Sequence, residues 1–297
     1  MPMIHTRRNL SPRWAGAFLL VALATQVHAQ ETAIVQVDPR TQARVELSPK
    51  HLAIHFLLSG KTQMFDIEPT GADVRLATDD FNFDGHKDVA VVDSHDGVTE
   101  GYQIFLFDPT AQHFAPLEVK AGGSCAGLAE VTVDATSHTL YSACCGTTWI
   151  LDAYRYTADG KLYLYQSTEE TGLAEDPALQ RLFGIKEGSA PIGRLLTYDD
   201  KGHVTARALA YRDSLSVVRA NARVAVDHLA LHDKPGVGVA KRFFVRGDAV
   251  EVEDVSGDLR WARVAYRSSA GASVHGWVTV TGLAPLSSAG QPGHEVR

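Results

Sequence analysis

Short apolar runs alternate with turn-forming residues along most of this chain. Between 31 and 211, runs long enough for one strand each are separated by turns such as Ser59-Gly60, Asp108-Pro109 and Asp159-Gly160. Such spacing is typical of β-hairpins. The pattern predicts an all-β fold, with an antiparallel, propeller-like hairpin domain over residues 30–211. No strict internal repeat is visible, so closure into a symmetric propeller is not predicted.

The pattern changes twice towards the C-terminus. Apolar residues in 171–191 fall at helical spacing and predict one short helical piece. After a linker at 212–222, five short alternating runs in 223–287 predict a small barrel. The tail at 288–297 is rich in Ser, Gly and Pro and is expected to be flexible.

The first 29 residues predict a secretory signal peptide. Arg7, Arg8 and Arg13 precede an apolar run, and Val27-His28-Ala29 provides a small-residue cleavage signal. Cleavage after Ala29 would send the protein to the periplasm or the medium, with no membrane anchor. A retained anchor is the alternative.

Composition narrows the class of partner. A chain of 297 residues with 45% hydrophobic residues suits two globular domains. Removing the signal peptide, which carries three Arg and no acids, takes the net charge from −7 to −10. This acidity argues against nucleic acid, which attracts basic proteins, and suits calcium or a basic protein partner.

One polar stretch stands out, the acid loop formed by residues 80–88. Oxygen-bearing side chains occupy its positions 1, 3, 5 and 9, Gly85 occupies position 6, and a β-branched run follows. Calcium takes about six to eight oxygen ligands, and glycine permits the sharp turn that gathers them. The spacing predicts a calcium site made by the Asp80, Asn82, Asp84 and Asp88 side chains and the His86 carbonyl.

Other interpretations of the acid loop remain open. Position 12 is Val91, where an EF-hand has a bidentate Glu, and a strand replaces the exiting helix. A solvated acidic turn without metal is the simplest alternative. Magnesium fits less well because it prefers octahedral sites that keep several waters, and zinc lacks Cys and His side chains at ligand spacing.

The three cysteines are candidates for a disulfide in an exported protein. Cys125 can pair with Cys144 or Cys145, or the two neighbours can pair with each other. Adjacent side chains on a strand point to opposite faces, so only one of the doublet can face Cys125 without distortion.

No catalytic constellation is evident, and the chain is predicted not to be an enzyme. A Gly-x-Ser-x-Gly elbow and a complete dinucleotide fingerprint are absent from the sequence. Tyr154, Tyr156, Trp261 and Trp277 are candidates for a sugar- or protein-binding face, with packing inside the sheets as the alternative.

Two resemblances add expectations. The acid loop, the run Tyr102 to Asp108, Cys144-Cys145 and Tyr154-Arg155-Tyr156 together resemble bacterial periplasmic FG-GAP-like proteins over about residues 70–170. That family includes immunity proteins of antibacterial type IV secretion systems, which inhibit lysozyme-like peptidoglycan hydrolases. The resemblance implies a calcium loop and a protein partner. This chain lacks the lipid-anchor cysteine typical of those proteins.

The second resemblance is to bacterial SH3-like domains and covers 223–287. It is carried by Leu231, Pro235, Gly247-Asp248, Trp261 and Gly276-Trp277-Val278. The resemblance implies binding of a protein or of peptidoglycan. The combined hypothesis is a calcium-stabilised binding protein of the cell envelope, in a narrower form an inhibitor of a peptidoglycan hydrolase. A wall-targeted enzyme or accessory that uses the SH3-like domain is the alternative.

Overall fold

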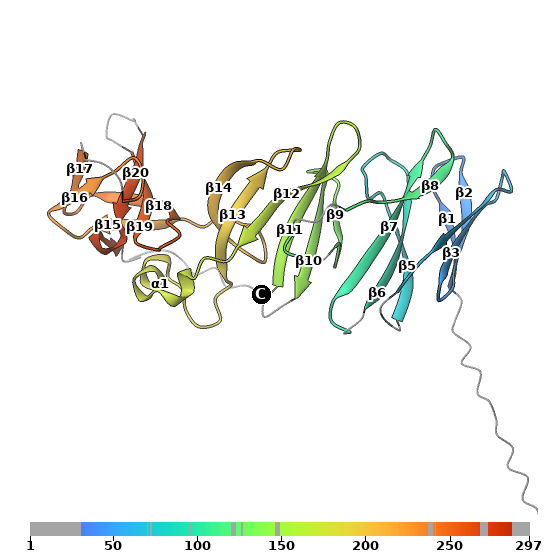
Figure 1. Ribbon diagram of the computed structural model, residues 1–297, viewed down its shortest axis with the longest axis horizontal. Coiled ribbons are helices and arrows are strands. Elements are labelled where there is room, and N and C mark those ends of the chain that lie inside the picture. The colour runs from blue at the N-terminus through green and yellow to red at the C-terminus, as the bar shows by residue number, and fades with distance from the viewer. Residues whose placement is uncertain are drawn as a thin grey trace, which may run out of the picture.

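The protein is an elongated row of antiparallel β-sheets (Figure 1). The computed structural model describes residues 31–69, 71, 73–94, 97–119, 123–125, 127–145, 149–236, 240, 242–267 and 273–286. The predicted signal peptide and the tail at 288–297 lie outside these residues. Within the described part, no helix is both long and apolar enough to cross a membrane. The predicted all-β class is confirmed.

Two four-stranded sheets form the N-terminal end of the row. In each sheet the strands follow one another in sequence order as a simple meander. The first sheet contains β1 (Glu31–Gln36), β2 (Gln42–Leu47), β3 (His51–Phe56) and β4 (Thr62–Asp66). The second sheet contains β5 (Asp73–Asp79), β6 (Asp88–Ser94), β7 (Glu100–Asp108) and β8 (His113–Pro116).

The third sheet is a six-stranded meander interrupted by a helical segment. Its strands are β9 (Thr132–Asp134), β10 (Thr139–Cys145), β11 (Trp149–Tyr156), β12 (Leu162–Glu169), β13 (Ile192–Tyr198) and β14 (Val204–Tyr211). Helix α1 (Pro177–Phe183) lies between β12 and β13, within the segment predicted to be helical. Asp176 caps its first turn by accepting the N–H groups of Ala178 and Leu179, and Gly184 ends it in the left-handed region.

A five-stranded sheet and a two-stranded ribbon make the C-terminal unit. The sheet contains β15 (Ala220–Val224), β18 (Ala249–Val255), β19 (Trp261–Arg267), β20 (Ser273–Thr279) and β21 (Leu283–Pro285). The ribbon pairs β16 (His228–Leu231) with β17 (Arg242–Val245). Strand β15 starts inside the segment expected to be a linker.

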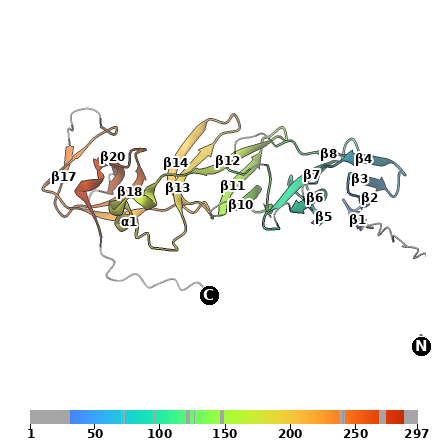
Figure 2. The same cartoon turned by 60° about the horizontal axis from the view of Figure 1, so that its bottom comes forward.

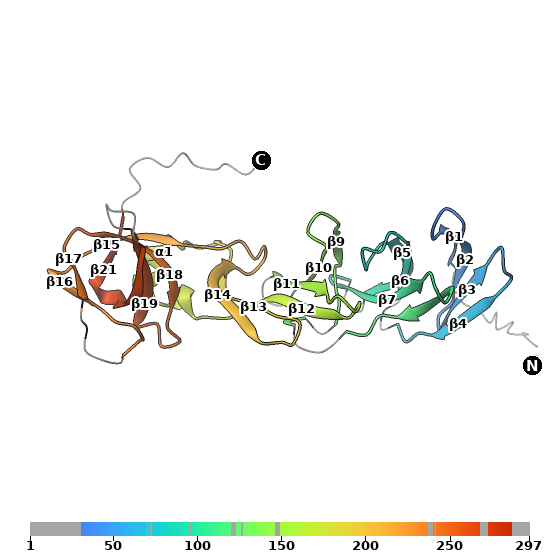
Figure 3. The same ribbon diagram turned by 90° about the horizontal axis from the view of Figure 1, so that it is seen from above.

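Burial along β6 explains why the sheets stack in a row. All residues from Asp88 to Val92 are buried, so this strand is covered on both faces. Val89 and Val91 join the core shared with the first sheet, whereas Ala90 and Val92 join the core shared with the third sheet. Because successive side chains of a strand point to opposite faces, β6 contributes alternate residues to two cores. The views in Figure 2 and Figure 3 show the same extended row, with no sheet closed on itself in the described part.

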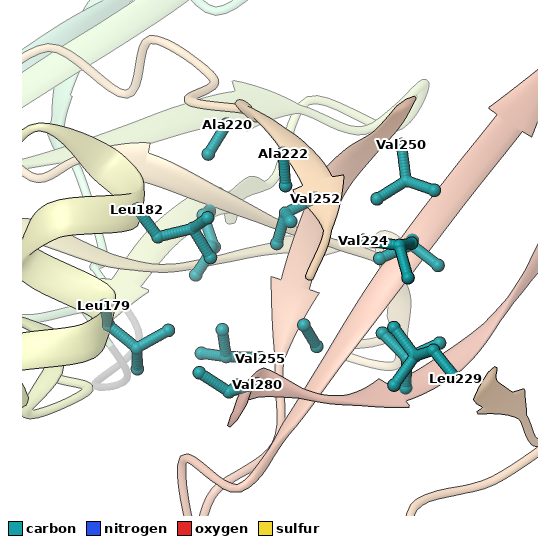
Figure 4. Close-up of a cluster of buried hydrophobic side chains, with 14 of the residues drawn as sticks. Leu179, Leu182, Ala220, Ala222, Val224, Leu229, Val250, Val252, Val255 and Val280 are labelled. Carbon is teal, nitrogen blue, oxygen red and sulfur yellow. The ribbon is translucent and has the colours of Figure 1, made fainter. Parts of the chain in front are cut away.

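The core of the C-terminal unit extends beyond the predicted domain boundary. Leu179 and Leu182 of α1 pack beside Ala222 and Val252 of the C-terminal sheet (Figure 4). Leu209, from the end of β14, belongs to the same cluster. The helical segment therefore connects the third sheet to the C-terminal unit through apolar contact.

One disulfide bond ties a loop to the third sheet. It joins Cys125 to Cys144 of β10, with their Cα atoms 5.7 Å apart. The structure thus selects one of the pairings that the sequence left open. The side chain of Cys145 lies outside the described structure.

We expect a Cys144→Ser variant to lose about 3 kcal/mol of unfolding free energy, because the bond closes a loop of 19 residues. Urea denaturation of the oxidised protein measures this loss. Cys145→Ser keeps both bonded sulfurs and is the matched control. Full stability of Cys144→Ser without any titratable thiol contradicts the pairing.

Candidate metal centre

The acid loop connects β5 to β6 through a tight backbone path. Phe83 and Gly85 both have positive φ, 63° and 85°. Asp80 supports this path, since its Oδ1 accepts the N–H of Asp84 at 3.0 Å and its Oδ2 accepts the N–H of Gly85 at 2.9 Å. The first predicted ligand therefore organises the turn from within. Phe83 takes a conformation that costs free energy for a residue with a side chain.

The middle of the loop repeats this arrangement. Asn82 Oδ1 accepts the N–H of Asp84 at 3.2 Å, and Asp84 Oδ1 accepts the N–H of His86 at 2.8 Å. The His86 ring places Nδ1 3.0 Å from the same Asp84 oxygen. The Asn82 and Asp84 side chains thus turn back towards the loop backbone, as the Asp80 side chain does.

Asp88 is the buried member of the set, with no exposed surface. Its Oδ2 accepts the N–H of Phe81 at 2.9 Å, and its Oδ1 accepts the N–H of Phe107 in β7 at 2.8 Å. Burial raises the pKa of Asp88 to about 7; the charges of Asp84 and Asp80 push the same way, while the two N–H donors oppose the shift. Among the described residues, neither Asp80 nor Asp88 makes an ion pair with a basic side chain.

The loop also contacts the sheets on both sides of its own. Towards the first sheet, the Lys87 N–H donates to the Val37 carbonyl at 2.8 Å, and His86 Nε2 lies 4.0 Å from Asp38. Towards the third sheet, the Phe83 ring stacks on His138 with centroids 5.3 Å apart. A single loop therefore fastens three neighbouring sheets.

Tyr156 completes the contact with the third sheet. Its ring meets Phe83 edge-on at 6.3 Å between centroids, and its hydroxyl is buried with no hydrogen-bond partner among the described residues. Burial raises the pKa of Tyr156, and the charges of Asp88, Asp80 and Asp84 raise it further. The hydroxyl thus lies within the electrostatic field of the acid loop.

The donor set has the chemistry that calcium requires. Carboxylate, amide and carbonyl oxygens are hard ligands, and each carboxylate has acceptor capacity beyond the bonds described above. In the described part of the chain, however, no three His, Cys, Asp or Glu side chains are grouped so as to hold a metal ion. The loop carboxylates instead point at backbone N–H groups. To bind calcium, Asp80 and Asp84 would keep one oxygen on the backbone and turn the other inward, so the site stays a prediction.

The predicted aromatic face does not form one surface. Tyr154 is only 2% exposed and belongs to the core between the second and third sheets, so its assignment to a ligand face is wrong. Its alternation on β11 gave no sign that a second sheet would cover it. Trp261 of β19 and Trp277 of β20 are half-buried. These strands lie far along the row from β11, which carries Tyr156 (Figure 1).

A second buried carboxylate was not predicted from the sequence. Asp152 in β11 is fully buried, and its Oδ2 accepts the N–H groups of Ser124 at 2.6 Å and Cys125 at 3.2 Å. A Cβ at Gly123 would lie 2.5 Å from this oxygen, so only glycine fits there. Asp152 therefore holds the loop that the disulfide also anchors. The Gly122-Gly123 pair before Cys125 was the one available signal.

Comparisons with known proteins give little. No protein-family model and no curated protein matches this sequence. A similarity search of solved structures returns TolB from Acinetobacter baumannii, at 13% identity and a TM-score of 0.20. The match covers 81% of this chain and 61% of that one. At so low a TM-score the two folds do not superpose as wholes, and nothing about this chain follows from the match.

Without calcium, we expect stability to fall as the pH rises from 4 to 7. The folded-state pKa of Asp88, about 7, exceeds its ordinary value of 3.8, so the folded protein holds the extra proton in this window. Asp84→Asn removes one repelling charge and should flatten the fall. Urea denaturation in a chelator at pH 5 and pH 8 measures both slopes.

The difference between the two slopes isolates the contribution of the loop from that of other titrating groups. Identical slopes for Asp84→Asn and the wild-type protein would mean that the two carboxylates do not interact.

Proposed function

We propose that this chain is an exported, non-catalytic binding protein of the bacterial cell envelope, braced by one calcium ion at the acid loop. The observation that carries the proposal is the position of this loop. It packs a buried carboxylate, Asp88, beside two others and also contacts the first and third sheets. A cation there would stabilise a scaffold rather than serve a reaction.

Electrostatics supports calcium in this role. Burial of Asp88 weakens the screening of its charge by water, and the charges of Asp80 and Asp84 repel it. A divalent cation would offset that repulsion and replace the lost hydration with direct ligation. The ligands would be the Asp80, Asn82, Asp84 and Asp88 side chains and the His86 carbonyl. Sites of this extracellular type bind with Kd on the order of 10⁻⁴–10⁻³ M.

The C-terminal unit supports the binding role. We assign it to the SH3-like class because its short strands and the turns between them carry the two motifs that suggested this class. Gly247 takes a positive φ of 97° in the Gly-Asp turn before β18. A Cβ at Gly276 would lie 2.5 Å from Leu231, so glycine lets β20 approach β16 closely. The expected partner is a protein or peptidoglycan, and the narrower form of the proposal is inhibition of a peptidoglycan hydrolase.

Calcium is expected to raise the melting temperature relative to a chelator, since it binds the folded state only. At a calcium concentration 100 times Kd the gain is about 2.7 kcal/mol. Asp84→Ala should abolish this shift. Asp134→Ala is the matched control, because Asp134 also accepts N–H groups in a tight turn, between β9 and β10. Differential scanning calorimetry measures all three proteins.

An Asp84→Ala protein that keeps the calcium shift contradicts the ligand set. A wild-type protein without any shift contradicts calcium as the brace.

The partner is tested separately with a peptidoglycan turbidity assay. Under the narrower form of the proposal, the purified protein slows clearing by a lysozyme-type hydrolase and clears nothing by itself. Clearing by the protein alone contradicts the non-catalytic role. Unchanged hydrolase activity contradicts the hypothesis that this protein inhibits that hydrolase. The envelope-binding role is then tested by pull-down from envelope extract.

A further inference from the structure

A cleft of about 520 Å³ separates the third sheet from the C-terminal unit. Strands β12, β13 and β14 form one side of it, and β18, β20 and the segment before residue 236 form the other. Ligand sites prefer such junctions, and their volumes run from roughly 300 to 1,000 Å³. The lining strands β13, β14 and β18 lie farther along the row than β5 and β6, which the acid loop connects (Figure 1).

The floor of the cleft is fixed by contacts between the two sides. Arg194 of β13 donates from Nη2 to the Val255 carbonyl at 2.8 Å, and its Nε lies 3.6 Å from Asp254 Oδ1. The Arg194 and Asp254 side chains are largely buried, so this ion pair is held in place and its two charges offset each other. The floor therefore presents fixed polar groups with no net charge.

Two aromatic side chains line the cleft, one from each side. Tyr198, at an irregularity in the pairing of β13 with β14, contributes one ring, and Trp277 of β20 contributes the other. Both are half-buried. The Trp277 backbone is fixed by two hydrogen bonds with His232, of 2.7 and 2.9 Å. Pro235 adds a further apolar surface to the wall that holds Trp277.

The remaining charges of the cleft also balance. Arg207 of β14 and Glu169 at the end of β12 are both exposed, and the described structure gives neither of them an ion pair. One free cation and one free anion beside a neutral floor attract neither a polyanion nor a polycation. They suit a neutral ligand with many hydroxyl or amide groups, since both side chains can form charge-assisted hydrogen bonds with such groups.

We propose that this cleft binds a neutral pyranose unit of a glycan, with Tyr198 and Trp277 packing against the ring and Arg207 and Glu169 bonding its polar substituents. A sugar ring has apolar C–H faces that match aromatic surfaces and a polar edge that matches the charged pair. This proposal rests on the proposed function in one respect, that the protein binds its target without transforming it.

The test is a titration of the full mature chain with two uncharged probes, tri-N-acetylchitotriose and maltotriose. Isothermal calorimetry is expected to detect binding of at least one sugar. Tyr198→Ala should weaken it at least tenfold. Tyr163→Ala is the matched control, because Tyr163 is a half-buried tyrosine of the same sheet that does not line the cleft. Far-ultraviolet circular dichroism checks that each variant is folded.

Glu169→Gln and Arg207→Gln provide a second route that does not depend on removing a ring. Each change is at an exposed position and should weaken binding several-fold without altering the fold. No response to either sugar overturns the proposal. So does sugar binding that is unchanged in Tyr198→Ala and in both charge variants, or binding at this cleft of an oligolysine or oligoglutamate peptide in place of sugar.

Running the titrations with calcium and with a chelator separates this proposal from the proposed function. If the wild-type protein binds neither sugar but calcium still raises its melting temperature, only the cleft assignment is overturned. Sugar binding without any calcium effect overturns the calcium brace only.

Discussion

The burial of the Asp88 carboxylate is the constraint on which the N-terminal half depends. Its two oxygens accept N–H groups from Phe81 in the acid loop and from Phe107 in β7, so one side chain fixes the loop against its own sheet. The loop, so fixed, presents Lys87 to the first sheet and Phe83 to the third. Other polar contacts also join these sheets. Gln63 of β4 exchanges two hydrogen bonds with the Phe114 backbone of β8, and Tyr102 of β7 donates its N–H to the Leu128 carbonyl ahead of β9. Apolar contact is non-directional, whereas these polar contacts specify one arrangement.

The other sheets are held in the row because neighbouring sheets pack face against face. The second sheet gives one face to each neighbour, which is why β6 is apolar on both sides. The third sheet packs its other part against the segment around Leu215, and helix α1 joins it to the C-terminal unit. Each junction has its own means of attachment: the acid loop, the disulfide-anchored loop over Asp152, and the Arg194 contacts with the C-terminal unit. The fold is therefore held together by several separate cores and junctions, and not by one central core.

Much of this could be predicted from the sequence because it is encoded locally. Hairpin turns such as Asp159-Gly160, the short helix and the oxygen spacing of the acid loop each depend on a few consecutive residues. What could not be predicted depends on how sheets stack. Alternation placed Tyr154 on a face of β11 but could not tell whether another sheet covers it. The Phe83–His138 stack and the cleft that Tyr198 and Trp277 line each bring together residues from separate sheets. The sequence of one strand does not show which residues of another sheet will lie against it. Strand geometry narrowed the cysteine pairing, and only the position of the loop decided it.

The row arrangement has a mechanical consequence whenever its two ends are pulled apart. Tension applied along the long axis acts across the sheet-to-sheet junctions, because each sheet is a separate link in series. The weakest junction then sets the force at which the molecule extends. At the second sheet part of that resistance comes from the acid loop, so whatever stiffens this loop strengthens the junctions that it spans. The disulfide lies within the third sheet and its loop, and it limits how far that link can unravel once a junction has opened.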